Sequence, residues 1–329
     1  MSFKDIIGQN RTGIILRNAI RNGSVAHAYL FFGPEGVGKR FTAITFAKAL
    51  NCLKEKEDSC DECDSCRKID GVNHPDVTGI SPEGNYIKIE QMRRLQRTVS
   101  FRAYEGRRKV VILDGADEMT DEAANSFLKT LEEPPDETVL ILICSNIHAL
   151  LPTIISRCQG IRFNLLPAES IMDILIKEKG IGIEEARLAA SLCKGRPGKA
   201  MDIDVETTLK NREEAFTILS DPLSEGVSSI FSRADIWTKD SDKVDDLLDH
   251  LSNLCRDIAI LKCSGNQDLI TNLDMIDGLR SVSERLSLSV VQSMFRMVQN
   301  TRGFLKRNAN LHLAIEVMMM RISDEMGYL

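Results

Sequence analysis

The sequence predicts an α/β fold in which a parallel-sheet domain is followed by a small helical domain and an all-helical C-terminal domain. Three short apolar runs, residues 28–32, 110–114 and 138–144, alternate with helical stretches in the first half of the chain. Strands that alternate with helices form parallel sheets buried on both faces. After Arg162 such runs thin out, and apolar residues recur at helical spacing.

Length and composition predict a folded, soluble chain. Its 329 residues are enough for about two domains. The hydrophobic share of 43% and the charged share of 27% are near the averages of globular proteins, which excludes a disordered chain. No apolar run reaches the roughly 18 residues of a membrane span, and MSFKDIIGQN lacks the features of a signal peptide. We therefore expect a cytoplasmic protein without a membrane partner. The net charge of −6 gives no overall attraction to nucleic acid.

The first apolar run, AYLFF, leads into a glycine-rich loop and then into FTAITFAKAL, a stretch typical of a helix. The loop fits the pattern G-x-x-x-x-G-K, in which amide groups, a helix N-terminus and a lysine converge on phosphate oxygens. We interpret it as a phosphate-binding loop, with the alternative of a glycine-rich turn that binds nothing. Its candidate nucleotide-binding residues are Gly33, Gly36, Gly38 and Lys39.

Two parts of the usual hydrolytic machinery are missing around this loop. The position that supplies a magnesium-binding hydroxyl in such ATPases is Arg40. The acid at the end of the second run is present as Asp114, but Gly115 stands where many such ATPases carry a glutamate that polarises the attacking water. Asp117 and Glu118 come too late in the chain to be equated with that glutamate. We expect little or no ATP hydrolysis, while binding of ATP or ADP stays open.

Four cysteines follow the first predicted helix at gaps of seven, two and two residues, namely Cys52, Cys60, Cys63 and Cys66. Cys-x-x-Cys spacing turns neighbouring thiolates onto one ion, and four sulfurs complete a tetrahedral Zn²⁺ shell. An iron–sulfur cluster is the rival, but the further cysteine followed by proline is missing. We predict a structural zinc and read His74 as structural. The acid-rich segment LKEKEDSCDECDS should repel phosphates.

A basic segment follows the cysteine module and has only Glu105 as a counter-charge. It is the best candidate in the chain for contact with phosphates, but a solvated helix face and loop is at least as good an interpretation because aromatic residues are sparse there. Its members are Arg93, Arg94, Arg97, Arg102, Arg107, Arg108 and Lys109.

The later segments are predicted to be mainly helical. Residues 121–133 form a helix that ends at Pro134 and Pro135. PAESIMDILIKEKG and IEEARLAASLCKG form two short helices joined by glycine. Helical spacing continues to the end of the chain, and we expect the methionines Met318, Met319 and Met320 to pack in a core or an interface.

Taken together, these motifs resemble the AAA+ clamp-loader family of bacterial DNA polymerase III. The similarity runs from FKDIIGQN and HAYLFFGPEGVGKR through HPDV, VVILDGADEMTDEAANSFLKTLEEPP and LLPTIISRCQGIRF to GRPGKA and NANLHLAIEVMMMRI. The resemblance implies an AAA+ P-loop core with a zinc module at 1–165, a helical lid at 166–207 and a helical collar at 208–329. It also implies a five-membered ring with delta and gamma or tau subunits, and contact with the sliding clamp and primed DNA through that complex.

The resemblance also assigns roles to single residues. Arg157 of the Ser-Arg-Cys triplet is implied to be an arginine finger, which stabilises γ-phosphate charge in a neighbour's ATP site. Ser145 and Asn146 match the sensor 1 region. GRPGKA occupies the sensor 2 place, but Gly198 stands where ATPase subunits carry arginine.

The leading hypothesis is a subunit of the DNA-directed DNA polymerase that does not hydrolyse ATP on its own and triggers hydrolysis in a neighbour. Two alternatives stay open. One is an active gamma/tau-like ATPase, and the other is a zinc-dependent DNA-binding protein with a vestigial nucleotide fold.

Overall fold

The computed structural model describes residues 1–202, 204–221, 228–239, 241–305, 307 and 309–328. They group into two compact units, Met1–Asp202 and Ile203–Leu329, each with its own core. The predicted lid at 166–207 belongs to the first unit as far as residue 202. The division of the chain into three domains stays a prediction.

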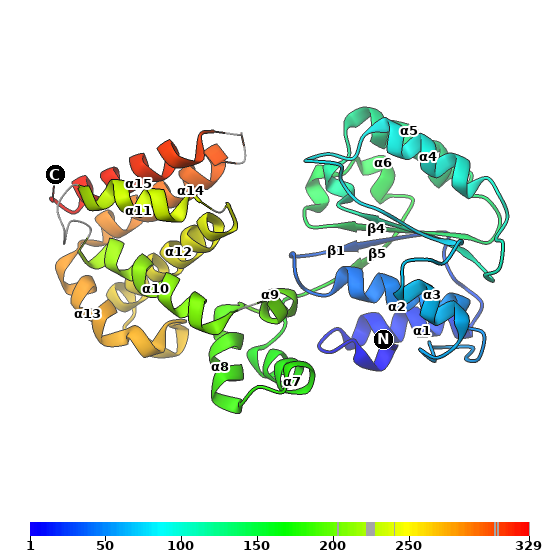
Figure 1. Cartoon of the computed structure of the whole chain (residues 1–329), viewed down its shortest axis with the longest axis horizontal. Coiled ribbons are helices and arrows are strands. Elements are labelled where there is room, and N and C mark those ends of the chain that lie inside the picture. The colour runs from blue at the N-terminus through cyan, green and yellow to red at the C-terminus, as the bar shows by residue number, and fades with distance from the viewer. Residues whose placement is uncertain (203, 222–227, 240, 306, 308, 329) are drawn as a thin grey trace. The chain divides into compact units, whose positions relative to one another are not determined.

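A five-stranded parallel sheet forms the centre of the first unit (Figure 1). Its strands lie in the order β2-β3-β4-β1-β5, and each strand is parallel to its neighbours. The three predicted runs are the three inner strands, which confirms the predicted α/β fold. The strands are β1 (Ala28–Phe32), β2 (Val77–Ile80), β3 (Lys109–Asp114), β4 (Thr138–Cys144) and β5 (Gln159–Arg162).

The two edge strands, β2 and β5, are absent from the sequence-based prediction. The sequence of β2 is VTGI, and none of its residues is fully buried. The sequence of β5 is QGIR, in which only Ile161 is buried. An edge strand is covered on fewer sides than an inner strand, so it has no need of a continuous apolar run, and the run was the signal that revealed the inner three.

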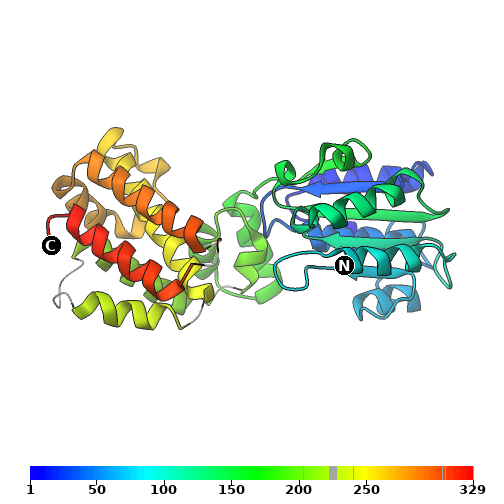
Figure 2. The same ribbon diagram turned by 90° about the horizontal axis from the view of Figure 1, so that it is seen from above.

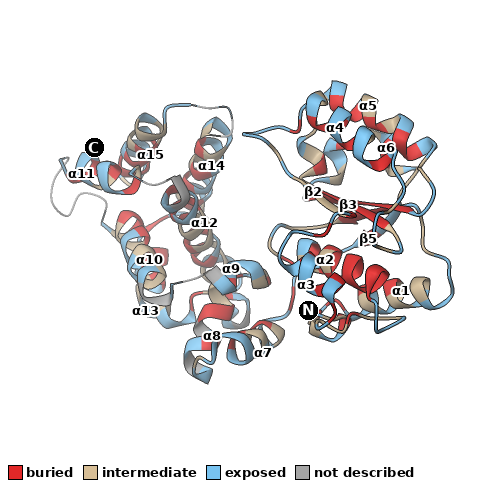
Figure 3. Cartoon of the chain, turned by 45° about the vertical axis from the view of Figure 1, so that its right-hand side comes forward, coloured by how far each residue is buried: buried red, intermediate tan, exposed pale blue. Residues whose placement is uncertain are grey.

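Helices cover both faces of the sheet (Figures 1 and 3). Side chains alternate along β1, so that Tyr29 packs edge-on against Phe46 of α2 while Leu30 joins the opposite core with Phe127 of α5. One face carries α1 (Asn10–Arg21), α2 (Lys39–Asn51) and α3 (Asp64–Asp70). The other carries α4 (Ile89–Val99), α5 (Asp121–Glu132) and α6 (Pro152–Ile155).

Three helices complete the first unit, namely α7 (Ala168–Lys179), α8 (Ile183–Leu192) and α9 (Pro197–Asp202). The first two are the short helices predicted from the sequence. Gly180 lies between them with a φ of 65°, a left-handed conformation that ends α7 and that glycine adopts without steric cost.

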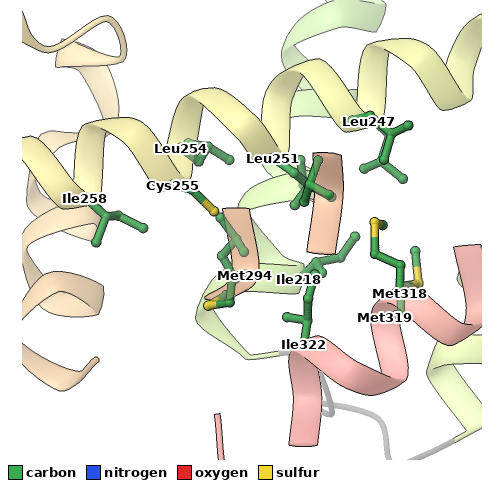
Figure 4. Close-up of a cluster of buried hydrophobic side chains, with 14 of the residues drawn as sticks. Ile218, Leu247, Leu251, Leu254, Cys255, Ile258, Met294, Met318, Met319 and Ile322 are labelled. Carbon is green, nitrogen blue, oxygen red and sulfur yellow. The ribbon is translucent and has the colours of Figure 1, made fainter. Parts of the chain in front are cut away.

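The described part of the second unit is helical, as predicted. Its helices pack around one apolar core, and α14 and α15 lie side by side (Figures 2 and 4). Met318 and Met319 are buried in this core, whereas Met320 is 39% exposed. The helices are α10 (Val205–Ser220), α11 (Ser228–Trp237), α12 (Ser241–Cys263), α13 (Ile276–Arg285), α14 (Leu288–Leu305) and α15 (Leu311–Glu325).

Candidate functional site

A cleft of about 870 Å³ lies at the carboxyl ends of the inner strands of the first unit. The glycine-rich loop and the start of α2 form its floor, and the ends of β3 and β4 form one wall. The N-terminal segment with Ile6 and Ile7 also lines the cleft, as do Ile174 of the following helical segment and Pro197. This place is where open parallel sheets bind ligands, and the size suits a nucleotide.

The loop has the backbone of a phosphate cradle. Gly33, Gly36 and Gly38 have φ values of 145°, 75° and 93°, which side chains other than glycine rarely adopt. Space is also lacking at the first of them, since a Cβ on Gly33 would lie 2.2 Å from the carbonyl oxygen of Phe163. The loop ends at Gly38, the N-cap of α2, as the predicted strand–loop–helix order requires.

Lys39 folds back over the loop instead of extending into solvent. Lys39 is 6% exposed, and its Nζ donates hydrogen bonds to the carbonyl oxygens of Gly33 at 2.5 Å and Pro34 at 2.7 Å. Burial lowers the pKa of this ammonium, although the carboxylates of Asp117 and Asp114 partly oppose the shift. Lys39 Nζ therefore lies within the glycine-rich loop, and its contact with a phosphate stays a prediction.

Arg40 pairs with the acid at the end of β3. Its Nη1 lies 3.1 Å from Oδ2 of Asp114. In P-loop ATPases this aspartate and the hydroxyl at position 40 hold the magnesium ion. Here the hydroxyl is absent, and the aspartate carries a guanidinium in place of a metal ion. The ion pair joins the replaced position 40 to the strand-end acid that the sequence retains.

The carboxylate of Glu118 lies beside Gly115, the position of the missing glutamate. A Cβ on Gly115, whose φ is 79°, would lie 2.9 Å from Oε2 of Glu118 and 3.2 Å from Cγ of Pro82. Asp117 is already used, because its Oδ2 accepts hydrogen bonds from the backbone nitrogens of Ser145 at 3.1 Å and Asn146 at 2.8 Å. Asp117 therefore anchors Ser145 and Asn146, which directly follow β4.

Glu118 also lines the cleft. Burial, together with the negative charges of Asp117, Asp114 and Glu35, raises the pKa of its carboxyl group. The four acids line the cleft together with the cations Lys39 and Arg40.

The backbone of α9 contacts the glycine-rich loop. The backbone nitrogen of Gly198 donates a 2.8 Å hydrogen bond to the carbonyl oxygen of Gly36. A Cβ on Gly198 would lie 3.1 Å from that oxygen and 3.2 Å from the Cα of Gly36. An arginine at this sensor 2 position would therefore require the lid and the loop to move apart by a few tenths of an ångström.

The four predicted ligand cysteines come together at one point. Their Sγ atoms all lie within 4.8 Å of one another. Cys52 caps α2, Cys63 and Cys66 belong to the start of α3, and Cys60 lies on the loop between them. Backbone N–H groups point at the sulfurs, from residue 55 to Cys52, from Cys63 to Cys60 and from Cys66 to Cys63. These thiols are placed to hold one metal ion.

The acids of the cysteine module are paired with the N-terminal part of the chain. Asp58 lies 2.6 Å from Arg17 of α1, and Glu57 lies 2.6 Å from Arg21. The fully buried Lys48 of α2 reaches Asp61 at 2.5 Å. The module thus fastens α1 to α2, a structural use of the acid-rich segment that spacing in the sequence does not reveal.

His74 is buried and takes part in a structural network. Its Nε2 lies 3.2 Å from Oγ of Ser65 in α3, and its Nδ1 accepts a hydrogen bond from the backbone of Asp76. Burial lowers the pKa of the imidazole, which favours the neutral form. Asp76 accepts hydrogen bonds from the backbone nitrogens of Tyr104, Glu105 and Gly106. This network supports the structural interpretation of His74.

The basic segment does not form one uniform surface. Lys109 is buried and donates to the carbonyl oxygens of Thr98 and Phe101, while Arg94 pairs with Glu83. Arg108 pairs with Glu137, which directly precedes β4. Exposed members remain on α4 and the loop after it, namely Arg93, Arg97, Arg102 and Arg107. Phosphate contact by this segment stays a prediction.

Arg157 lies just after α6, within a tight set of contacts. Nη1 donates to the carbonyl oxygen of Thr153 at 3.0 Å, and Nη2 lies 2.7 Å from Oε1 of Glu132. The arginine side chain is 36% exposed. Burial raises the pKa of the neighbouring Cys158 thiol to about 12, so this cysteine is an unreactive packing residue.

A family model described as DNA polymerase III, delta subunit, matches residues 8–167, and one described as DNA polymerase III, delta subunit, C terminal, matches residues 206–324. DNA polymerase III subunit delta′ of Bacillus subtilis (strain 168) is 30% identical over 320 residues, covering 96% of this chain and 96% of that protein. The chain belongs to the delta′ family of DNA polymerase III subunits.

Two further proteins are similar to this delta′ chain. DNA polymerase III subunit delta′ of Pseudomonas aeruginosa is 34% identical, over 62% of this chain and 66% of that protein. DNA polymerase III subunit tau of Bacillus subtilis is 27% identical, over 97% of this chain and 61% of that protein. Within the described part of the chain, no helix combines the length and apolar character needed to cross a bilayer.

Two features of the folded delta′ chain are not evident from its sequence. One is Glu132, the partner of Arg157, which lies in the segment LEEPP that the family resemblance had marked without a role. The other is the N-terminal segment that lines the cleft. Both become visible only in the folded chain, where residues far apart in the sequence come into contact.

Proposed function

We propose that this chain is a non-hydrolysing delta′ member of the clamp-loader ring, which lends Arg157 to the ATP site of an adjacent subunit. The ion pair between Arg40 and Asp114 carries the first half of this proposal, because it occupies the carboxylate that a P-loop ATPase uses to hold magnesium. The exposure of the Arg157 guanidinium supports the second half, since a finger must be able to reach a neighbouring chain.

The proposed mechanism divides the two roles between subunits. A neighbouring gamma or tau subunit binds and hydrolyses ATP, and Arg157 stabilises the negative charge that develops on the transferred phosphoryl group. The proposed partners are the delta and gamma or tau subunits in a hetero-pentamer. Through that complex the chain takes part in loading the sliding clamp onto primed DNA, as a component of the polymerase and without an autonomous ATPase.

For the metal, we propose a structural Zn²⁺ held by Cys52, Cys60, Cys63 and Cys66. Four clustered thiols and their backbone N–H donors fit a closed tetrahedral shell, which leaves no position for a reacting water. Zn²⁺ would cross-link the end of α2 to the start of α3, and the module's acids would then hold α1 in place.

The isolated chain, assayed with Mg²⁺ and primed DNA, is expected to hydrolyse ATP at a rate no higher than its Lys39→Ala variant. The physical reason is that position 40 lacks the hydroxyl that binds Mg²⁺ and position 115 lacks the glutamate that polarises the attacking water. Steady-state phosphate release measures this rate. Robust turnover that disappears in the Lys39→Ala variant would instead identify a gamma/tau-like ATPase.

Replacing Arg40 by threonine is expected to restore part of the magnesium site. The substitution frees Asp114 from its ion pair and supplies the missing hydroxyl. Calorimetric titration with Mg²⁺–ATP should give an affinity higher than that of the parent chain by roughly tenfold, or about 1.4 kcal/mol. Arg40→Ala is the matched control, since it frees the carboxylate without adding a hydroxyl. Equal affinities in all three chains, with and without Mg²⁺, would show that Arg40 does not block the site.

A further inference from the structure

Polar contacts hold the side chains of Ser156 and Arg157 against residues of α6 and α5. Ser156 Oγ and Arg157 Nη1 both donate to the carbonyl oxygen of Thr153, at 3.1 and 3.0 Å. Nη2 of the arginine reaches across to Oε1 of Glu132 at the end of α5, 2.7 Å away. The guanidinium is therefore held from two directions, once by its own helical turn and once by a neighbouring helix.

Both supports rest on rigid parts of the core. Leu131, next to Glu132, is 1% exposed, and Ile154, next to Thr153, is fully buried in the same cluster. Two prolines directly after Glu133 prevent α5 from continuing. These features place the backbone of Glu132 at a set distance from Arg157.

Local helix energetics do not explain an acid at this position. Glu132 is the last residue of α5, where the helix dipole disfavours negative charge. Its side chain is 50% exposed and contributes nothing to the core. The contact with Arg157 is the interaction that an acid at this position makes possible.

We propose that Glu132 is a positioning residue for Arg157, which holds the guanidinium in the orientation from which it serves the neighbouring ATP site. This inference rests on the proposed function of Arg157. A guanidinium has five N–H donors, and the contacts to Thr153 and Glu132 use two of them. The remaining three are available to a phosphoryl group. Holding the planar group in advance removes the need to order a long, flexible side chain in the transition state.

The test is the ATPase of the reconstituted clamp loader with clamp and primed DNA. Glu132→Ala in this chain is expected to lower the maximal rate by about tenfold, because an untethered finger loses its alignment. The KM for ATP should not change, since the neighbour's own loop binds the nucleotide. Glu132→Gln keeps an oxygen acceptor and should recover part of the rate. Glu133→Ala, which removes the adjacent exposed carboxylate, should behave as the parent.

A double variant separates positioning from a general structural role. In a complex that already carries Arg157→Ala, adding Glu132→Ala should cause no further loss, because the acid acts only through the arginine. If Arg157→Ala alone leaves turnover unchanged, the proposed function of Arg157 fails. If Arg157→Ala slows turnover, the inference is overturned by parental or faster turnover in Glu132→Ala, or by additive losses in the double variant. Should Glu132→Ala fail to assemble, the near-isosteric Glu132→Gln serves for the same cycle, with an expected loss of about threefold.

Discussion

Replacing Arg157 by alanine lowers the ATPase rate of the reconstituted clamp loader by about 10³-fold or more, while the complex still assembles. Fingers in related phosphoryl transfers contribute rate factors of this size because they neutralise charge that develops only in the transition state. Arg157 is partly exposed and makes its described contacts to Thr153 and Glu132 near the surface, so its removal leaves the core intact. Steady-state phosphate release with clamp and primed DNA measures the rate, and size-exclusion chromatography measures assembly.

Arg162→Ala provides the control for this substitution. Arg162 lies on β5, five residues further along the chain, and is also exposed. Removing its charge should leave turnover at the parental level. A complex that assembles with Arg157→Ala and hydrolyses ATP at the parental rate would remove the finger from the account.

Replacing Cys63 by serine lowers the metal content and the thermal stability of the chain together. Loss of one thiolate opens the shell, and a structural zinc contributes directly to folding. Because the module also holds α1 through the pair between Asp58 and Arg17, the damage should extend beyond the cysteine loop. We expect Tm of the first unfolding transition to fall by about 10 °C. Elemental analysis and calorimetry check the two quantities.

A second cysteine distinguishes metal loss from the loss of any thiol. Cys263, at the end of α12, is exposed and lies outside the cluster. Cys263→Ser should keep the metal and the parental Tm. The zinc assignment is wrong if the parent chain binds no metal yet unfolds at the same temperature as the metal-loaded chain. Iron and sulfide in the elemental analysis would instead establish the rival cluster.

Features encoded by neighbouring residues were predictable from the sequence. The glycine loop before Lys39 and the spacing of the four cysteines each depend on residues close together in the sequence. In the structure the loop leads into α2 and the four thiols come together, as expected. The inner strands were recognisable because burial on both faces demands an apolar run. The edge strands β2 and β5 lack that demand and were not found.

Pairings between distant positions were not predictable in the same way. The sequence shows that Arg40 departs from the ATPase motif and that Asp114 matches it. Their ion pair, however, depends on how the end of β3 lies beside the start of α2. The contact between Glu132 and Arg157 likewise depends on how α5 packs on α6. Periodicity reveals which face of an element is buried, and it contains no information on which exposed charges meet.

The central claim is that this chain supplies a guanidinium to a neighbour's phosphoryl transfer and has no transfer site of its own. The most direct test counts the sites that trap ADP with aluminium fluoride, a mimic of the transferred phosphoryl group that an arginine finger stabilises. The account predicts that the isolated chain traps none and that the complex with Arg157→Ala traps fewer than the parent complex. Trapping by the isolated chain, or equal numbers in the two complexes, would contradict it.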